Sequence, residues 1–247
     1  MKEKIYTIPV TEAYETDCKC PLCYLEEKLE TEAIDYALGA AMMEPDYRCE
    51  SNEIGYCNRL FERMYMRPNK LSLALVLETH LEEIRKKLDT YEKEISGIEN
   101  TKQGLFKKSD SSLVAGKLNA EFNKIECECM ICNKINHTME RYCDVLLYMW
   151  ANDDAFKQKF QNSRGVCLKH EKMLLSIVNK SLNDKKARSF IKELYQKQKS
   201  ELEKNQELIH KFVLKFDYRF HDMELGEAQT AVSDTIEKIS GYIDKEI

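Results

Sequence analysis

Hydrophobic residues recur every three or four positions over long stretches of this chain, which is the period of an α-helix with one buried face. Leu25, Leu29, Ile34 and Leu38 follow this period in a helix predicted over residues 24–39, which Gly39 ends. The same pattern predicts a helix from residue 57, a longer one from residue 70, and helices over 132–150 and 167–179. Only residues 5–10, which include a proline, read as an extended segment.

The longest predicted helix lies near the C-terminus, over residues 184–220. Its apolar stripe continues for most of that length, through Ile191, Leu194, Leu202, Ile209, Phe212 and Phe216. At about 1.5 Å per residue such a helix exceeds about 50 Å. Either it packs along the whole protein, or part of it projects and binds a helix of a partner protein. A last helix is predicted over 227–243.

Composition supports an all-α protein. The 247 residues contain 8 glycines and 4 prolines, and every proline lies at or before Pro68, which leaves a long C-terminal region without helix breakers. The formal net charge of −5 argues against nucleic-acid binding, which needs a basic face. The N-terminus has no apolar run typical of a signal peptide, and the longest apolar stretch, Leu71–Leu77, is too short to cross a bilayer. We therefore expect a cytoplasmic protein that binds no membrane.

Ten cysteines are present, and in a reducing compartment so many favour metal or thiol chemistry over disulfides. Cys129 and Cys132 form a Cys-x-x-Cys turn, and Cys167 and His170 follow as a Cys-x-x-His turn. We call each of these ligand-bearing turns a knuckle. Two knuckles of these types supply the four ligands of a tetrahedral zinc site.

A partial copy of this pattern lies upstream. Cys18, Cys20 and Cys23 align with Cys127, Cys129 and Cys132 at an offset of 109 residues, and Asn52, Gly55 and Cys57 align with Asn162, Gly165 and Cys167 at an offset of 110. Eight of the ten cysteines obey this register, which indicates an internal duplication. The sequence predicts a first repeat over 1–96, a polar linker over 97–118, and a second repeat with the long helix over 119–247.

In the second repeat, the ligand set predicted from proximity in sequence is Cys129, Cys132, Cys167 and His170. Mixed cysteine and histidine sites of this type hold structural zinc, and with all four positions taken we expect no hydrolytic chemistry. Cys127 is assigned to a supporting position beside these ligands.

In the first repeat, Leu60 stands where the second repeat has His170. The predicted set is Cys20, Cys23 and Cys57, with Cys18 or Cys49 as the fourth ligand, or an open position. An all-cysteine set also admits an iron–sulfur cluster, although the spacing fits no standard ferredoxin pattern.

Nothing else in the chain indicates an enzyme. There is no dinucleotide fingerprint, phosphate-binding glycine loop or Ser-His-Asp order. The sequence predicts a zinc-binding structural or interaction protein. The alternatives are a sensor of thiol oxidation or metal, in which Cys18, Cys127 or the incomplete first site responds, and an iron–sulfur redox protein.

The chain resembles an uncharacterised bacterial family known only as a domain of unknown function, whose members carry Cys-Pro-x-Cys and Gly-[Phe/Val/Tyr]-Cys-x-x-His in a helical context. The matching segments include Cys20–Cys23, Gly55–Cys57, the whole second repeat and Lys215–Arg219. The resemblance implies the metal-binding knuckles and no known activity. Leu60 departs from the family pattern.

Overall fold

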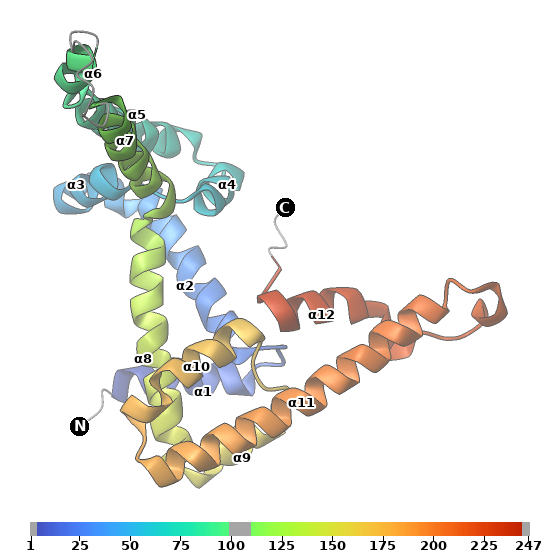
Figure 1. Cartoon of the computed structure of the whole chain (residues 1–247). Helices are drawn as coiled ribbons and strands as arrows, with labels where there is room; N and C mark the ends of the chain where they lie inside the picture. The colour runs from blue at the N-terminus through green and yellow to red at the C-terminus, as the bar shows by residue number, and fades with distance from the viewer. Residues whose placement is uncertain (1–3, 99–109, 244–247) are drawn as a thin grey trace. The chain divides into compact units, whose positions relative to one another are not determined.

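The computed structural model of the chain describes residues 4–98 and 110–243 and shows an all-α protein (Figure 1). No strand occurs among these residues, and the predicted fold class is confirmed. In chain order, the helices are η1 (Lys4–Tyr6), α1 (Thr7–Glu15), α2 (Pro21–Ala37), η2 (Ala40–Met43), α3 (Pro45–Ile54), α4 (Asn58–Met66), α5 (Lys70–Asp89), α6 (Glu92–Ile98), α7 (Asp110–Cys127), α8 (Met130–Asn152), α9 (Asp154–Asn162), α10 (Leu168–Ser181), α11 (Asp184–Leu214), η3 (Tyr218–Phe220), η4 (Gly226–Thr230) and α12 (Ala231–Ser240).

The described residues form two compact units that do not coincide with the two sequence repeats. The terminal unit holds residues 4–29 and 135–243, and the central unit holds 30–98 and 110–134. The boundaries fall inside α2 and α8, so each of these helices begins in one unit and ends in the other. The division at 97–118 that the repeats suggest stays a prediction. Residues 99–109 of that linker lie outside the described residues, and 110–118 belong to α7.

Aromatic side chains make the core of the terminal unit. Phe160 is completely buried, and its ring centroid lies 6.0 Å from that of Tyr14 on α1 and 5.6 Å from that of Phe190 on α11. Trp150 at the end of α8 packs edge-on against Phe190 at 5.0 Å. Edge-on and tilted contacts of this kind add to the free energy gained by burial. The core therefore holds α1, α8, α9 and α11 together.

The long C-terminal helix is shorter than its pattern predicts. α11 has 31 residues and ends at Leu214, which corresponds to about 46 Å. Its first half is buried through residues that include Phe190 and Leu194, and α12 then folds back to contact both α10 and α11 (Figure 1). This returning helix brings Lys238 to the start of α10, beside the Cys-x-x-His knuckle of Cys167 and His170.

The central unit contains α5, which packs against both α3 and α4, and the helical pair of α6 and α7 (Figure 1). A buried carboxylate, Glu30 on α2, accepts hydrogen bonds from Arg59 at 2.9 Å and from Arg63 at 2.5 Å, both on α4. Because Glu30 is fully buried and Arg63 only 4% exposed, this pair orients α4 on α2.

The extended N-terminal segment predicted for residues 5–10 is wrong. Residues 7–15 are α1, and Pro9 occupies its first turn, where a proline removes no helical hydrogen bond. No helix among the described residues is long and apolar enough to cross a bilayer.

Candidate metal sites

Both Cys-x-x-Cys knuckles open a helix in the same way. The carbonyl of Cys20 accepts a bond from Tyr24 at 3.1 Å, and the carbonyl of Cys129 accepts one from Asn133 at 3.0 Å. In each knuckle the backbone N–H of the second cysteine donates to the sulfur of the first, at 3.4 and 3.5 Å. A sulfur at a helix N-terminus is favoured as a thiolate, because unpaired N–H groups and the helix dipole stabilise its charge.

The Gly-x-Cys segments that open α4 and α10 also share one conformation. Gly55 and Gly165 have φ of 77° and 75°, in the left-handed region that favours glycine. Cys57 precedes α4 with φ −70° and ψ 161°, and Cys167 precedes α10 with φ −72° and ψ 164°. The internal repeat inferred from sequence is therefore visible in the backbone of the ligand-bearing turns.

Four ligands converge in the terminal unit: Cys20, Cys23, Cys167 and His170, which we call the four-ligand group. The Sγ atoms of Cys23 and Cys167 are 3.5 Å apart, and Nδ1 of His170 lies 3.2 Å from Cys167, 3.4 Å from Cys23 and 3.6 Å from Cys20. Around a tetrahedral zinc ion, two sulfurs lie about 3.8 Å apart and a sulfur and a nitrogen about 3.6 Å apart. The ligand atoms thus already have nearly the spacing that zinc requires.

The four-ligand group is sealed from solvent. Cys20 and Cys23 are each 5% exposed, and Cys167 and His170 are completely buried. The backbone N–H of Cys167 also donates to the sulfur of Cys20 at 3.4 Å, which joins the two knuckles directly. The ligands therefore fasten the start of α10 to the start of α2.

Glu26 is a buried carboxylate that faces the outer ring nitrogen of His170. It lies one helical turn after Cys23 on α2, is 4% exposed, and places Oε2 3.4 Å from Nε2 of His170. Lys169 holds the same carboxylate, with Nζ at 2.6 and 2.7 Å from its two oxygens. A carboxylate on the second ring nitrogen of a metal-binding histidine selects the ring tautomer and increases the basicity of the ligand.

The close contacts within the four-ligand group shift the pKa values of Cys167, His170 and Glu26. Cys20, Cys23 and His170 hold the pKa of Cys167 well below its ordinary value. Burial alone lowers the pKa of His170, but its contacts with Cys167, Cys20 and Glu26 outweigh burial and raise that pKa to about 11. Burial likewise favours the neutral form of Glu26, yet His170 and Lys169 bring its pKa below the ordinary value. The imidazolium of His170 therefore lies beside the thiolate of Cys167, and a metal ion at Nδ1 would take the place of its proton.

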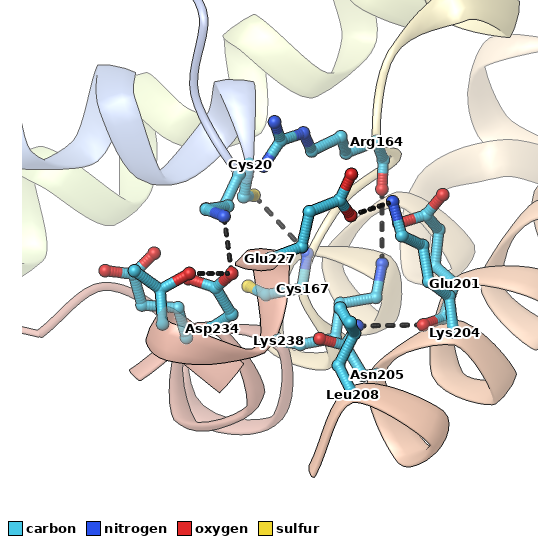
Figure 2. A pocket seen from close by; sticks show the side chains of 13 residues that line it. Cys20, Arg164, Cys167, Glu201, Lys204, Asn205, Leu208, Glu227, Asp234 and Lys238 are labelled. Carbon is cyan, nitrogen blue, oxygen red and sulfur yellow. Dashed lines mark hydrogen bonds and ion pairs between the residues drawn. The ribbon is translucent and has the colours of Figure 1, made fainter. Parts of the chain in front are cut away.

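A cavity of about 320 Å³ lies next to Cys20 and Cys167, and Lys238 of α12 lines it (Figure 2). Lys238 is 6% exposed and donates to the carbonyls of Val166 at 2.9 Å and Arg164 at 3.4 Å. Its ammonium group thereby fixes the loop that leads into Cys167. Other cations at this cavity are paired with carboxylates, Lys19 with Asp234 and Lys204 with Glu227.

Three ligands converge in the central unit: Cys57, Cys129 and Cys132, which we call the three-cysteine group. The Sγ atoms of Cys57 and Cys132 are 3.7 Å apart. The Cys132 thiol and the backbone N–H groups of Cys132 and Cys57 outweigh the effect of burial and lower the pKa of Cys129 to about 5. Cys129 is buried, whereas Cys57 and Cys132 are half-buried. This group thus carries a thiolate near neutral pH, and two of its three cysteines are only half-buried.

His80 on α5 supports the knuckle of Cys57. Its Nδ1 lies 2.8 Å from the carbonyl of Asn52, and a Cβ atom at Gly55 would lie 2.4 Å from its Nε2. The backbone of Gly55 in turn accepts a bond from the N–H of Met130 at 3.1 Å, which ties this turn to the start of α8. Gly55 is therefore required both by its φ and by the closeness of His80.

The structure corrects the ligand grouping that the sequence predicts. Cys129 and Cys132 lie with Cys57, whereas Cys167 and His170 lie with Cys20 and Cys23. The sets predicted from proximity in sequence, Cys129–Cys132 with Cys167–His170 and Cys20–Cys23 with Cys57, are both wrong. Each Cys-x-x-Cys knuckle pairs with the Gly-x-Cys turn of the other repeat.

The proposed fourth ligands of the first repeat join neither group. Cys18 is half-buried, with its sulfur 3.7 Å from the carbonyl of Ala13, and Cys49 is exposed. Cys127 is exposed at the end of α7 and Cys143 is buried in α8. Of the nine residues predicted as ligands, seven are therefore brought into the two groups.

Three supporting residues were missed from the sequence. Glu26 follows Cys23 at helical spacing, so it is recognisable as a candidate partner for a nearby ligand. His80 is 6% exposed, although its acidic neighbours in sequence suggest a solvated helix face. Lys238 is 68 residues from His170 in sequence, and no local pattern marks it.

Comparison with known proteins gives one match. Residues 1–246 match the Family of unknown function (DUF6062). The chain belongs to this family. The matched residues include all the knuckles, and the match confirms the resemblance noted from the sequence. The family description assigns no activity. No curated protein and no solved structure matches the chain.

Proposed function

We propose that this protein is a zinc-binding helical protein in which the four-ligand group holds a structural zinc ion. The observation that carries the proposal is the arrangement of Cys20, Cys23, Cys167 and His170 at tetrahedral spacing. Three thiolates and one imidazole are ligands that zinc accepts readily. Glu26 supports the histidine as a zinc-site carboxylate does.

The structural role follows from burial and position. All four places of the tetrahedron are taken by side chains that are at most 5% exposed, so a bound ion has no position for water or substrate. The ligands come from two helix starts that are more than 140 residues apart in sequence. Metal that binds only the folded state adds its binding free energy to stability. The ion would thus connect the start of α10 to the start of α2. It would have no free coordination position for catalysis.

The wider assignments stay predictions. A cytoplasmic location and a protein partner bound through the long C-terminal helix fit the proposal and rest on the sequence. An iron–sulfur cluster, which takes four thiolates, fits the four-ligand group less well, because one ligand there is histidine. The half-buried positions of Cys57 and Cys132 favour a second role for the three-cysteine group, in metal exchange or sensing.

Elemental analysis of anaerobically purified full-length protein tests the proposal. We expect bound zinc, with one zinc fewer per chain in Cys23→Ser and no change in Cys49→Ser, a matched control at an exposed cysteine. Cys23→Ser should also lower the Tm, because the connection between α10 and α2 is lost. Equal zinc content in both variants, or iron with the visible absorption of an iron–sulfur cluster, would reject a structural zinc at the four-ligand group.

A further inference from the structure

The three-cysteine group has no protein ligand in the fourth tetrahedral position. In the part of the chain that the structure describes, no other cysteine, histidine or carboxylate joins Cys57, Cys129 and Cys132. Comparison of the two repeats nevertheless shows which residue of α4 corresponds to the fourth ligand. His170 follows Cys167 by three residues on α10, and Leu60 follows Cys57 by three residues on α4.

Leu60 takes the place on α4 that His170 takes on α10. The backbone conformations of Cys57 and Cys167 agree within a few degrees, so the two helices leave the knuckle in the same direction. Both Leu60 and His170 are completely buried. An apolar side chain therefore stands where the other group presents a nitrogen ligand.

The support for the histidine is replaced as well. Glu26, which faces His170, follows Cys23 by three residues, and the residue at the same spacing after Cys132 is Ile135. In one group a histidine and a carboxylate stand at these two positions, and in the other a leucine and an isoleucine do. Leucine replaces the histidine ligand and isoleucine replaces its carboxylate partner. Because both positions are apolar, we interpret the three-cysteine group as a complete three-ligand site.

We propose that Cys57, Cys129 and Cys132 bind a thiophilic ion that is satisfied by three sulfurs, of the class of Cu(I) and As(III). Zinc in proteins takes four ligands, and an apolar neighbour at the fourth position disfavours a bound water. Thiolates are soft donors that prefer soft ions. Cys57 and Cys132 are only half-buried, so this group lies nearer to solvent than the four-ligand group, whose residues are at most 5% exposed.

The binding reactions need no oxidant or reductant. Cu(I) forms three bonds to sulfur, and the thiols that are still protonated release their protons to solvent. Arsenous acid, As(OH)₃, forms three As–S bonds and loses three As–O bonds, and each hydroxide leaves as water with a proton from a thiol or, for a cysteine that is already a thiolate, from solvent. Three waters are released, and arsenic stays trivalent. Neither reaction depends on zinc at the four-ligand group, so this inference stands or falls separately from the proposed function.

Anaerobic titration of the zinc-loaded full-length protein with Cu(I), in the presence of a competing Cu(I) chelator, tests the site. We expect one tightly bound copper per chain, with the zinc retained. X-ray absorption at the copper edge should show three sulfur neighbours and no nitrogen or oxygen. Mass spectrometry after treatment with arsenite should show one arsenic gained and three hydrogens lost. The decisive measurements use the unaltered protein and do not depend on any variant folding.

Variants then identify the ligands and the role of the leucine. Cys132→Ser should lower copper affinity at least tenfold, whereas Cys49→Ser on α3 should leave it unchanged. Leu60→His should create a second three-cysteine, one-histidine set and bind one additional zinc per chain. A nitrogen or oxygen neighbour on copper, copper that displaces zinc from the four-ligand group, or equal copper affinity in Cys132→Ser and Cys49→Ser would overturn the proposal.

Discussion

Replacing Glu26 by glutamine tests whether the carboxylate prepares His170 for metal. The side chain keeps its size and its place on α2, but it loses the charge that faces Nε2 of His170 at 3.4 Å and Nζ of Lys169 at 2.6 Å. Removing such a supporting partner weakens metal binding by about 10- to 100-fold. That loss corresponds to about 1.4–2.7 kcal/mol of binding free energy.

The same free energy is lost from the stability of the zinc-loaded protein. When free zinc exceeds the Kd in both proteins, each tenfold loss of affinity lowers the free energy of unfolding by about 1.4 kcal/mol. For a protein of this size, about 2–4 °C in Tm accompanies each kcal/mol, so we expect a decrease of about 3–11 °C. Thermal unfolding is followed by circular dichroism in a zinc buffer of fixed free concentration.

Measurements with and without metal separate the role of Glu26 toward zinc from its ion pair with Lys169. In excess chelator the difference between Glu26→Gln and the unaltered protein should shrink to the cost of the ion pair alone. Lys169→Met, which removes the other partner of Glu26, serves as the matched control and should change Tm equally in both conditions. If Glu26→Gln lowers Tm by the same amount with zinc and with chelator, the carboxylate supports packing and not the metal.

Three further predictions concern Gly55, Glu30 and the removal of zinc. Gly55→Ala should destabilise the central unit by more than about 1 kcal/mol in chemical denaturation, because of its φ of 77° and the closeness of His80. Gly116→Ala, whose added methyl has open space in α7, should be neutral or stabilise, and equal losses would refute this reasoning. Glu30→Gln leaves Arg63 buried without its carboxylate and should cost about 3–5 kcal/mol in the same assay; a loss below about 1 kcal/mol would show that the pair is dispensable. Removing zinc with chelator should lower the Tm of the unaltered protein and leave that of Cys23→Ser nearly unchanged, and an equal shift in both would place the stabilising metal elsewhere.

The fold class and the chemistry of the ligands can be predicted from local patterns in the sequence. Helical periodicity and the scarcity of glycine and proline predict an all-α protein, because an amphipathic helix leaves its period in a local window. The spacing of Cys20 and Cys23, or of Cys167 and His170, places each pair on one turn, and this too is a local property. Aligning the two repeats identifies Leu60 as the position where the first repeat lacks the histidine of the second.

Which knuckles share a ligand group could not be predicted from the sequence, because it depends on how the helices pack. Each knuckle supplies two ligand positions, and the spacing of the cysteines does not distinguish Cys57 from Cys167 as the partner of Cys23. The choice depends on which helix starts the packing brings together, which is a property of the whole core. Proximity in sequence favoured pairing within a repeat, whereas the fold pairs the start of α2 with the start of α10 and the start of α8 with the start of α4. Lys238 and His80 stayed hidden for the same reason, since each contacts its knuckle from a different helix.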